Sequence, residues 1–454
     1  MENKTLRRFF SFGTSRPHGG ASVPHRKNTA DSESVVMPPP ERVIIAMQQH
    51  IGAPCEPTVK PGDPVAVGQV VGDTKAFVSA PIHASVSGTV QAITEIQLPG
   101  GQKTKAVVIE SDGEQRVHES VQPPVIQSRE EFAAAVRASG LVGLGGAGFP
   151  AHVKLNPPKD AKIDTLIVNG AECEPYITAD YREIMENSWD ILSGVYAVKD
   201  LLGVENVIIA IESNKPDGIK VLSAIANNSN DPDNQVNIKV LPSRYPQGAE
   251  KVLIQATTGR VVPTGKLPSD VGVVVMNITS IAFLSRYMKT GMPLTTKRLT
   301  IDGSAIWSPK NVIVPIGTPI KDVIAFAGGY KEDPRKIIMG GPMMGLAMVD
   351  DSLPVLKQNN AILAFDEKEA KLMEPLPCIR CGKCVQACPM KLMPTSIEQL
   401  YKAKDVEGLQ KAGAMTCMEC GCCAFVCPAG RRLVQSMRLS KALIKNAPKK
   451  EAKG

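Results

Sequence analysis

Aromatic residues and long apolar runs are both scarce in this chain of 454 residues. Aromatics make up 4% of the sequence, and no apolar run reaches the roughly 18 uninterrupted residues that a membrane-spanning helix needs. The best candidate, VGVVVMNITSIAFL (271–284), is interrupted by Asn277, Thr279 and Ser280. The N-terminal MENKTLRRFFSFGTS also lacks the apolar core of a signal peptide. We therefore expect a cytoplasmic chain that does not itself span a membrane.

Excess charge is absent from most of the chain and is concentrated at its end. The formal net charge is +7, and the residues from Arg431 onward carry eight Lys/Arg and one acidic residue, which accounts for all of it. Such a basic tail can dock to an anionic membrane surface, an acidic partner or nucleic acid, or it can be a solvated, partly disordered terminus. The tail alone does not support a nucleic-acid function, and we expect no nucleic acid as partner.

Cysteine is nearly absent outside one short region. Nine of the eleven cysteines lie between 378 and 427, and only Cys55 and Cys173 lie elsewhere. A disulfide framework would distribute cysteines through the chain, so this pattern argues against one. The clustered cysteines form two runs, CIRCGKCVQACP (378–389) and CMECGCCAFVCP (417–428). Both have the spacing C-x2-C-x2-C-x3-C-P, which is typical of modules that hold two [4Fe–4S] clusters.

In such modules the first three cysteines of one run share a cluster with the fourth cysteine of the other run. The expected ligands are Cys378, Cys381, Cys384 and Cys427 for one [4Fe–4S] cluster, and Cys417, Cys420, Cys423 and Cys388 for the second. A pair of zinc sites is the alternative, but zinc sites usually combine two CxxC pairs. Cys422 stands where the first run has Lys383, so it is either a bystander or a competitor of Cys423 as a ligand.

A glycine-rich loop precedes the cysteines by more than 200 residues. In GLGGAGFP (143–150), Gly143, Gly145 and Gly148 fit G-x-G-x-x-G. Glycines let a backbone approach a phosphate closely, and free N–H groups stabilise its charge. The loop follows a predicted helix, which begins with the capping-box pattern of Ser128 and Glu131. Because no strand runs into the loop, it does not have the context of a Rossmann fingerprint.

The segments after this loop predict an α/β domain with a largely parallel sheet. KIDTLIVNGAECEP (162–175), NVIIAIE (206–212) and VNIKVLP (236–242) are strand-like and alternate with helical segments. Ligands of such sheets bind beyond the carboxyl ends of the strands, where Asn169, Glu172 and Glu174 would lie. The alternative for the two glutamates is a pair at a helix N-terminus in a βα loop.

Residues 120–280 resemble the flavoprotein subunit of respiratory complex I. The FMN- and NADH-binding motifs of that subunit occur here in the same order, as GLGGAGFP, NGAECEP, YPQGAE and the Asn of VVVMNITS. The resemblance implies that Gly143, Gly145, Gly146 and Lys154 cradle the FMN phosphate and ring edge. It also implies that Asn169 and Asn277 bind ribityl or phosphate oxygens, that Tyr245 and Gly248 close the site, and that Glu174 and Glu250, with Glu172 nearby, contact NADH. Ala171 and Ala249 replace acidic residues of that family.

A second resemblance covers nearly the whole chain. GGASVPHRKNT (19–29), MQQHIGAPCEPTVKPGDPVAVGQVVG (47–72) and SAPIHASVSGTV (79–90) resemble the N-terminal part of the C subunit of the Rnf (Rsx) electron-transport complexes. The last two stretches also resemble a biotinyl/lipoyl-type barrel sandwich, but the hairpin tip HASVSG lacks the modified lysine. We therefore expect a docking or structural domain. Residues 297–330 resemble the soluble-ligand-binding β-grasp (SLBB) module, for which a spacer role is expected.

The expected fold is a multidomain α/β and β protein. A flexible N-terminal segment (1–34) is expected to precede a barrel sandwich (35–118) and a Rossmann-like FMN/NADH domain (119–290). An SLBB-like β-grasp module (291–365), an α-helical ferredoxin-like domain with two [4Fe–4S] clusters (366–432) and a basic tail (433–454) are expected to follow.

These resemblances imply the peripheral electron-input subunit of a membrane-bound, ion-translocating NADH:ferredoxin oxidoreductase. NADH gives hydride to FMN, and single electrons pass through the two clusters to other subunits and indirectly to ferredoxin, on the cytoplasmic side of the inner membrane. Ion movement would belong to the partners. The alternatives are a metabolosome-type cobalamin reductase, a hydrogenase or formate dehydrogenase flavin subunit, and a non-catalytic scaffold that carries clusters without flavin.

Overall fold

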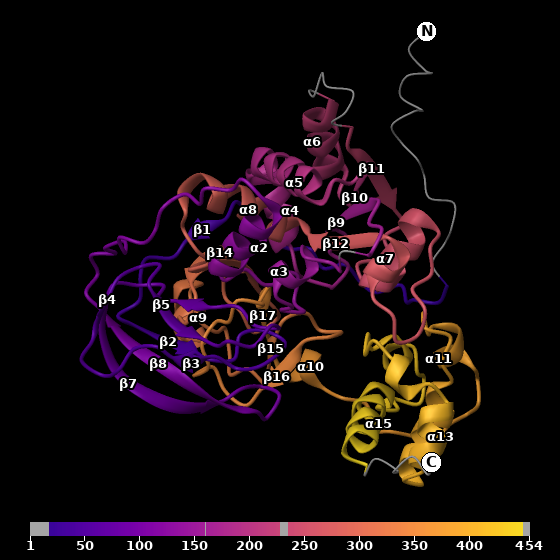
Figure 1. The fold of residues 1–454 in the computed structure, drawn as a ribbon. Helices are drawn as coiled ribbons and strands as arrows, with labels where there is room; N and C mark the ends of the chain where they lie inside the picture. Colours follow the sequence, from indigo (N-terminus) through magenta and orange to yellow (C-terminus); the bar gives the residue numbers. More distant parts are fainter. Residues whose placement is uncertain (1–17, 159, 228–234, 448–454) are drawn as a thin grey trace, which may run out of the picture.

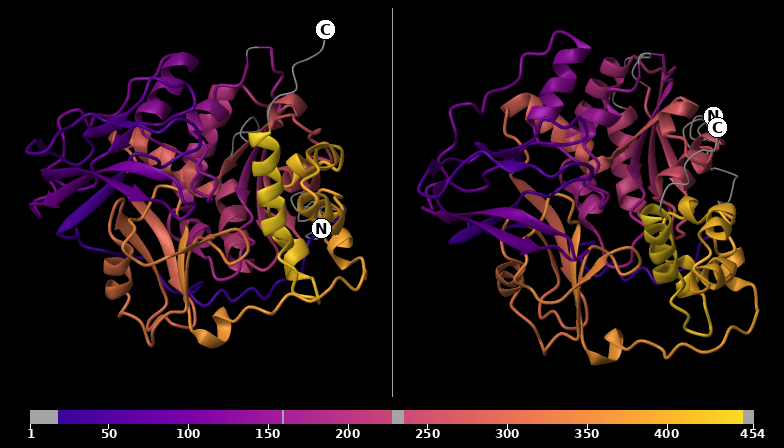
Figure 2. Two further views of the ribbon diagram at one scale, coloured as in Figure 1. Left: turned by 90° about the horizontal axis from the view of Figure 1, so that it is seen from below. Right: turned by 60° about the horizontal axis from the view of Figure 1, so that its bottom comes forward.

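The computed structural model describes residues 18–158, 160–227 and 235–447. Figure 1 shows a β-rich part formed by early residues at one end and a small helical part formed by the last residues at the other. An α/β domain and a second sheet lie between them, and the two views of Figure 2 show the same arrangement.

The α/β domain is built on the predicted parallel sheet. Its strand order is β11 (Asn237–Leu241), β10 (Asn206–Glu212), β9 (Thr165–Gly170) and β12 (Val273–Asn277), and every pairing is parallel. The helices of this domain are α2 (Arg129–Ala138), α3 (Ala151–Lys154), α4 (Ala179–Glu186), α5 (Ser188–Leu202), α6 (Pro216–Asn227), α7 (Glu250–Thr258) and α8 (Ile278–Thr290).

Alternation along the central strands explains why helices cover both faces of this sheet. Leu166 and Val168 of β9 belong to the large core that includes α5 and α8, whereas Ile167 belongs to the smaller core formed with α7. Successive side chains of a strand point to opposite faces, so a continuous apolar run requires cover on both. Because β9 and β12 pair in parallel, their carboxyl ends lie at one edge of the sheet, with α3 nearby (Figure 1).

The first β-rich part consists of two small antiparallel sheets around one apolar core. One sheet has the order β2 (Arg42–Ala46), β8 (Lys103–Ser111), β7 (Gly88–Gln97) and β4 (Pro64–Val65), and the other β3 (Glu56–Pro57), β5 (Val70–Asp73) and β6 (Ile82–His83). The completely buried side chains of Val43, Ile82 and Ile109 come from both sheets. This arrangement agrees with the predicted two-layered barrel.

The second sheet contains a strand that the sequence analysis did not assign to it. Its order is β1 (Val35–Val36), β14 (Lys310–Pro315), β13 (Thr296–Asp302), β17 (Ala361–Phe365), β15 (Lys336–Met339) and β16 (Leu346–Met348), with α9 (Ile320–Phe326) after β14. β1 precedes the barrel in the chain yet pairs with β14 in parallel. The barrel and the α/β domain therefore both lie in the chain between β1 and the other strands of this sheet.

The cysteine-rich part is helical, as predicted. It contains α10 (Glu367–Ala370), α11 (Lys383–Gln386), α12 (Pro394–Lys402), α13 (Val406–Lys411), a 3-10 turn (Ala414–Thr416), α14 (Cys422–Phe425) and α15 (Leu433–Asn446). The structure differs from the expectation of a solvated tail from 433, because α15 packs Leu433 and Met437 against this part. Residues 448–454 of the tail lie outside the described residues. No helix in the described part of the chain is long and apolar enough to cross a bilayer.

The N-terminal segment also differs from the expectation of a flexible stretch. Residues 1–17 lie outside the described residues, but 18–34 run as a strap across three parts of the molecule. Gly20 N donates to Ala387 O (2.9 Å) and Ala21 N to Tyr245 O (2.8 Å), while Asn28 contacts Asp302 of β13. This segment has few apolar residues, but it is ordered because its polar groups form hydrogen bonds with other parts of the fold. A local sequence pattern does not predict such distant partners.

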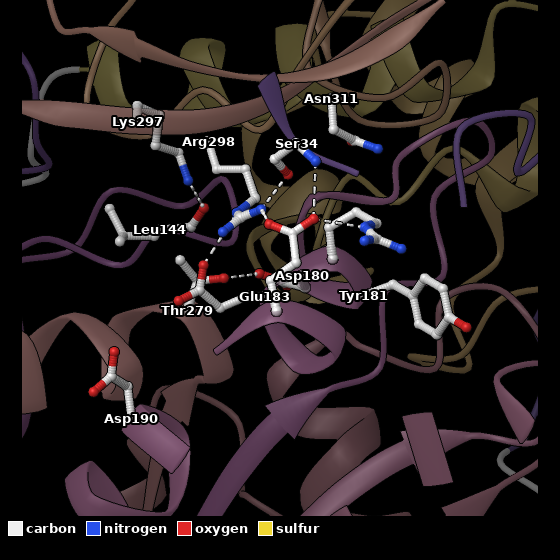
Figure 3. A network of polar contacts seen from close by, with 12 residues as sticks. Ser34, Leu144, Asp180, Tyr181, Glu183, Asp190, Thr279, Lys297, Arg298 and Asn311 are labelled. Atoms are coloured by element: carbon white, nitrogen blue, oxygen red, sulfur yellow. Dashed lines mark hydrogen bonds and ion pairs between the residues drawn. The ribbon is translucent and has the colours of Figure 1, made fainter. Parts of the chain in front are cut away.

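A buried ionic network joins the second sheet to the α/β domain (Figure 3). Arg298 of β13 donates to Glu183 of α4 (3.1 Å) and also pairs with Glu186, and the side chains of Arg298 and Glu183 are only 5% and 2% exposed. Arg286 of α8 binds the same Glu183 at 2.6 Å. Next to this network, Lys297 Nζ donates to the carbonyl of Leu144 in the glycine loop (3.0 Å). The junction thus fixes the loop as well as the two domains.

Removing the Arg298 charge is expected to weaken this junction strongly. In Arg298→Met, the carboxylates of Glu183 and Glu186 lose a partner in a dry environment, a change that typically costs about 3–5 kcal/mol. Urea unfolding followed by far-UV circular dichroism measures it. The exposed pair Lys220–Asp217 provides the control Lys220→Met, expected within about 1 kcal/mol of the parent. Equal losses in the two variants would contradict a structural role for the buried network.

Candidate cofactor sites

The glycine loop is closed by its own backbone and exposes its middle. Gly143 N donates to Phe149 O (2.8 Å) and Gly148 N to Gly143 O (3.1 Å), while Leu144 N donates to Ser280 Oγ of α8 (3.1 Å). Gly145 and Gly146 lie at the surface between these anchors. The loop is therefore held at both ends and accessible at its centre, as a phosphate cradle requires.

Gly145, one of the exposed glycines, lies against Asn277 at the end of β12. A Cβ atom on Gly145 would come within 2.9 Å of Asn277 Nδ2, and Asn277 pairs with Asn169 in the register of β12 and β9. Asn277 caps α8 by accepting from Ser280 N (3.1 Å), and Asn169 Nδ2 donates to Gly248 O (2.9 Å). Four of the predicted residues, Gly145, Asn277, Asn169 and Gly248, thus form one row along this edge.

Lys154 and Glu250 form an ion pair near the same edge. Lys154 Nζ donates to the Glu250 carboxylate and to Val275 O of β12 (3.3 Å), and about a third of each side chain remains exposed. Glu250 is the first residue of α7, where a carboxylate is favoured by the helix dipole. The ammonium is thus positioned beside the strand ends with its charge partly accessible to a ligand.

Glu172, Glu174 and Tyr245 do not point toward the glycine loop in this structure. Glu172 accepts a hydrogen bond from Asp180 N (2.8 Å) at the start of α4, as expected for a carboxylate at a helix N-terminus. Glu174 accepts from Met343 N (3.0 Å) and Met344 N (2.9 Å), which belong to the loop between β15 and β16. Tyr245 is 1% exposed, and its hydroxyl lies 3.5 Å from Glu174 Oε1. Glu172 thus stays within the α/β domain, whereas Glu174 joins that domain to the β15–β16 loop.

Lys27 of the strap holds the loop that carries both glutamates. Its Nζ donates to the carbonyls of Glu172 (2.8 Å), Glu174 (2.8 Å) and Ile177 (2.5 Å). Burial lowers the pKa of Lys27, and the carboxylate of Glu172 opposes that shift. The sequence alone indicates no role for Lys27, because the three carbonyls lie about 150 residues away in the chain.

Two buried glutamines near the glycine loop and the strand ends were also missed. Neither polar atom of the Gln247 amide, nor Gln358 Oε1, has a hydrogen-bond partner among the described residues, although all three atoms are buried. Gln247 precedes Gly248, and Gln358 Cβ would lie 3.2 Å from a Cβ on Gly148. Buried polar groups normally have partners, so these orphaned atoms fit a site that takes a polar ligand. Together with the glycine cradle, they fit FMN.

The four cysteines expected to share the second cluster line one cavity. This cavity lies between the two runs and is lined by Cys388, Cys417, Cys420 and Cys423, with Leu392 and Met437 beside them. Burial raises the pKa of Cys423 to about 12 and raises the pKa values of Cys388 and Cys417, with the neighbouring sulfurs adding to each shift. Thiols gathered in an apolar cavity fit a cluster, because bound iron would replace their protons.

The other four cysteines meet closer to the surface. Burial raises the pKa of Cys384, and Cys427 and Cys378 raise it further, so cysteines of both runs lie near one another. Cys378 and Cys381 are exposed. Cys422 is completely buried and lines the same cavity as Cys420 and Cys423, and its Sγ lies 3.9 Å from the carbonyl oxygen of Tyr245.

Comparisons with known families match each part of the fold. The matching family models are an FMN-binding domain described as Nuo51 (136–286), an RnfC barrel sandwich hybrid domain (15–114), an SLBB domain (298–347) and a 4Fe-4S dicluster domain (370–428). These domains define an FMN- and iron–sulfur-containing oxidoreductase chain.

Close relatives specify the family further. The chain is 43% identical to the C subunit of the proton-translocating ferredoxin:NAD(+) oxidoreductase complex of Clostridium ljungdahlii, over 94% of this chain and 93% of the relative. It is 44% identical to the Na(+)-translocating counterpart of Acetobacterium woodii (93% and 96%) and 41% identical to the C subunit of the ion-translocating oxidoreductase complex of Rhodobacter capsulatus (92% and 80%). The chain belongs to the RnfC family, the C subunits of ion-translocating oxidoreductase complexes.

The buried carboxyl group of Glu174 is expected to make stability depend on pH. Burial raises its pKa from 4.5 to about 7. The folded state therefore holds a proton that the unfolded state has lost between these values, so stability falls as the pH rises from 4.5 to 7. Glu174→Gln is expected to remove up to about 3 kcal/mol of that fall, since it cannot ionise.

Urea unfolding at pH 5, 6, 7 and 8 measures this slope. The loss of one N–H acceptor in Glu174→Gln lowers stability equally at every pH and therefore does not alter the slope. Glu95→Gln, at an exposed pair with Lys103, is the control and should retain the parent's slope. An unchanged slope in Glu174→Gln would show that Glu174 is ionised in both states.

Proposed function

We propose that this chain is the electron-input subunit of a membrane-bound, ion-translocating NADH:ferredoxin oxidoreductase. The proposal is supported by the exposed centre of the glycine loop near the strand ends and by a cavity lined by Cys388, Cys417, Cys420 and Cys423 in the same chain. The names of the relatives supply the reaction and the membership of a larger complex. Because those relatives differ in the ion they translocate, the coupling ion stays open.

The glycine loop and the strand ends form the proposed flavin site. FMN, when bound, accepts a hydride from NADH and releases electrons one at a time. Gly143, Gly145 and Gly146 let the backbone approach the phosphate, and Lys154 supplies a positive charge. Asn169, Asn277 and Gly248 offer polar groups along the adjacent edge, and Glu250 keeps Lys154 in place. Gln247 and Gln358 are added as ligand contacts because their amide atoms are otherwise orphaned.

The cysteines form two proposed ligand sets across the two runs. One set is Cys378, Cys381, Cys384 and Cys427, and the other is Cys388, Cys417, Cys420 and Cys423. Backbone N–H groups already approach several of these sulfurs, for example Leu392 N to Cys388 Sγ (3.3 Å) and Glu419 N to Cys417 Sγ (3.3 Å). Such contacts stabilise the charged sulfurs and tune the reduction potential of a bound cluster.

The subunit is peripheral in this proposal and lies on the cytoplasmic side of the inner membrane. Its partners are the other subunits of the complex, which carry out ion movement and pass electrons onward to ferredoxin. The barrel (35–118) and the SLBB-like module (291–365) serve to dock and to orient the redox domains, at 119–290 and 366–432. The network of Arg298 and Glu183 supports the orienting role.

An anaerobic NADH titration of the iron-reconstituted chain tests this function. Flavin absorbance near 450 nm, where oxidised flavins absorb, and the broader cluster absorbance are followed together. Reduction of both by NADH, with far less by NADPH, is expected. If no flavin is retained and only dithionite reduces the clusters, the chain is a cluster-bearing scaffold and the proposed function is wrong.

A substitution in the glycine cradle tests the flavin site itself. Gly145→Ala places a Cβ 2.9 Å from Asn277 Nδ2 without requiring a strained backbone, and it is expected to weaken FMN binding at least tenfold, or about 1.4 kcal/mol. Gly100→Ala, at a hairpin tip where a Cβ meets nothing within 4 Å, is the matched control. Fluorescence titration with FMN measures both affinities. Equal affinities would place the flavin elsewhere.

A further inference from the structure

An open cavity of about 510 Å³ lies between the barrel and the α/β domain. Residues 73–77, which follow β5 of the barrel, form one wall, and Ala133, Ala134 and Arg137 of α2 form the other. His152 of α3 completes the lining. Cavities that bind small molecules usually measure about 300–1,000 Å³, so this one can hold a ligand of moderate size.

This cavity is on the opposite side of α3 from the proposed flavin site. His152 Nε2 lies 3.2 Å from Phe77 O of the barrel. Lys154 instead pairs with Glu250 beside the strand ends. Side chains two residues apart on a helix point in directions about 200° apart, which explains why the two contacts diverge. A ligand in the cavity is therefore held by residues that the flavin site does not use.

Two basic side chains line the cavity. Arg137 donates to both carboxylate oxygens of Asp73 (2.6 and 3.3 Å) and to Thr74 O (2.8 Å), so its guanidinium is held in place while the side chain stays 31% exposed. Lys75 is exposed and has no ion-pair partner among the described residues. Two cations against the one carboxylate of Asp73 leave an excess of positive charge, which favours an anionic ligand such as a phosphate.

Phe77 and His152 give the cavity an aromatic side and a polar atom without a partner. The Phe77 side chain is 66% exposed, and its ring meets that of His152 edge to face, with the centroids 6.2 Å apart. Burial lowers the pKa of His152, so the imidazole is neutral at pH 7. Because the carbonyl of Phe77 accepts from Nε2, the buried Nδ1 is an acceptor, and it has no partner among the described residues. Buried acceptors normally have a donor, so a ligand with an N–H or O–H group is favoured.

We propose that this cavity binds a nucleoside monophosphate, at a site separate from the flavin and the clusters. The phosphate pairs with Lys75 and with the exposed part of Arg137, the base lies against the Phe77 ring, and the ligand's amino or hydroxyl groups supply a donor beside His152. A phosphate monoester carries a charge of roughly −1.5 to −2 at pH 7, which suits two cations better than a single carboxylate does. Inorganic phosphate alone would leave the aromatic side of the cavity without a contact.

Isothermal titration calorimetry of the full chain with AMP tests the ligand class, and its readout does not depend on electron transfer. AMP is expected to bind at least roughly tenfold more tightly than adenosine, inorganic phosphate or 4-hydroxybenzoate. Adenosine lacks the charge, phosphate lacks the ring, and 4-hydroxybenzoate has a ring and a donor but only one negative charge. If AMP does not bind, or if one of the three binds as tightly, the assignment of a nucleoside monophosphate is overturned.

Substitutions at two exposed positions locate the site. Lys75→Ala and Phe77→Ala alter exposed side chains, so both proteins are expected to fold, and each is expected to weaken AMP binding at least roughly tenfold. The matched controls are Lys60→Ala, at another exposed lysine of the barrel, and Trp307→Ala, at an aromatic side chain that is 65% exposed. Both controls should keep the parent's affinity. Parent-like affinity in Lys75→Ala and Phe77→Ala would place AMP outside this cavity.

Binding of AMP at the strand ends would have a different signature. Gly145→Ala alters the glycine cradle and leaves residues 73–77 unchanged, so it is expected to bind AMP as the parent does. If Gly145→Ala loses AMP binding while Phe77→Ala retains it, AMP occupies the strand-end edge and the proposal is overturned. The NADH titration is a separate measurement, so a failure of the proposed function is distinguishable from a failure of this one.

Discussion

The hydrogen bonds from Lys27 to three carbonyls of the 172–177 loop are the interaction on which most of the architecture depends. One ammonium group donates to Glu172, Glu174 and Ile177 in a buried place, where unpaired carbonyls would be costly. The loop held in this way directs the Glu172 carboxylate to α4 and the Glu174 carboxylate to the β15–β16 loop. The strap therefore sets how the α/β domain meets the second sheet.

That meeting point also determines where the redox sites lie relative to one another. Tyr245, beside Glu174, contacts the strap through Ala21 and the cysteine-rich part through Cys422. On the other side of the α/β domain, Lys297 and Arg298 of β13 fix the glycine loop and α4. A rigid junction suits electron transfer, because small changes in separation alter the rate strongly. The many domain contacts are thus consistent with a relay of fixed geometry.

The sequence predicted those features whose causes are local. The 2-2-3 spacing of the cysteines predicts that the two runs share their clusters, and in the structure Cys388 lies near Cys417 and Cys427 near Cys384. Apolar strand runs predicted the parallel sheet and its binding edge. The resemblance implies that Glu172, Glu174 and Tyr245 contact the cofactors, and this stays a prediction. In the structure Glu172 accepts from Asp180 N at the start of α4, whereas Glu174 accepts from the β15–β16 loop and lies beside Tyr245. A carboxylate beside a strand end has several possible partners, and the sequence does not indicate which one lies closest.

By itself, the sequence determined the kinds of chemistry this protein can perform, because clustered cysteines, a glycine cradle and strand periodicity each follow from residues close together in the chain. Only the tertiary structure decided the partners of Lys27, Cys422 and β1. Each of these depends on groups that lie far away in the sequence, such as the carbonyls near Glu172 for Lys27, Tyr245 for Cys422 and β14 for β1. Their partners exist only once the separate domains have packed together.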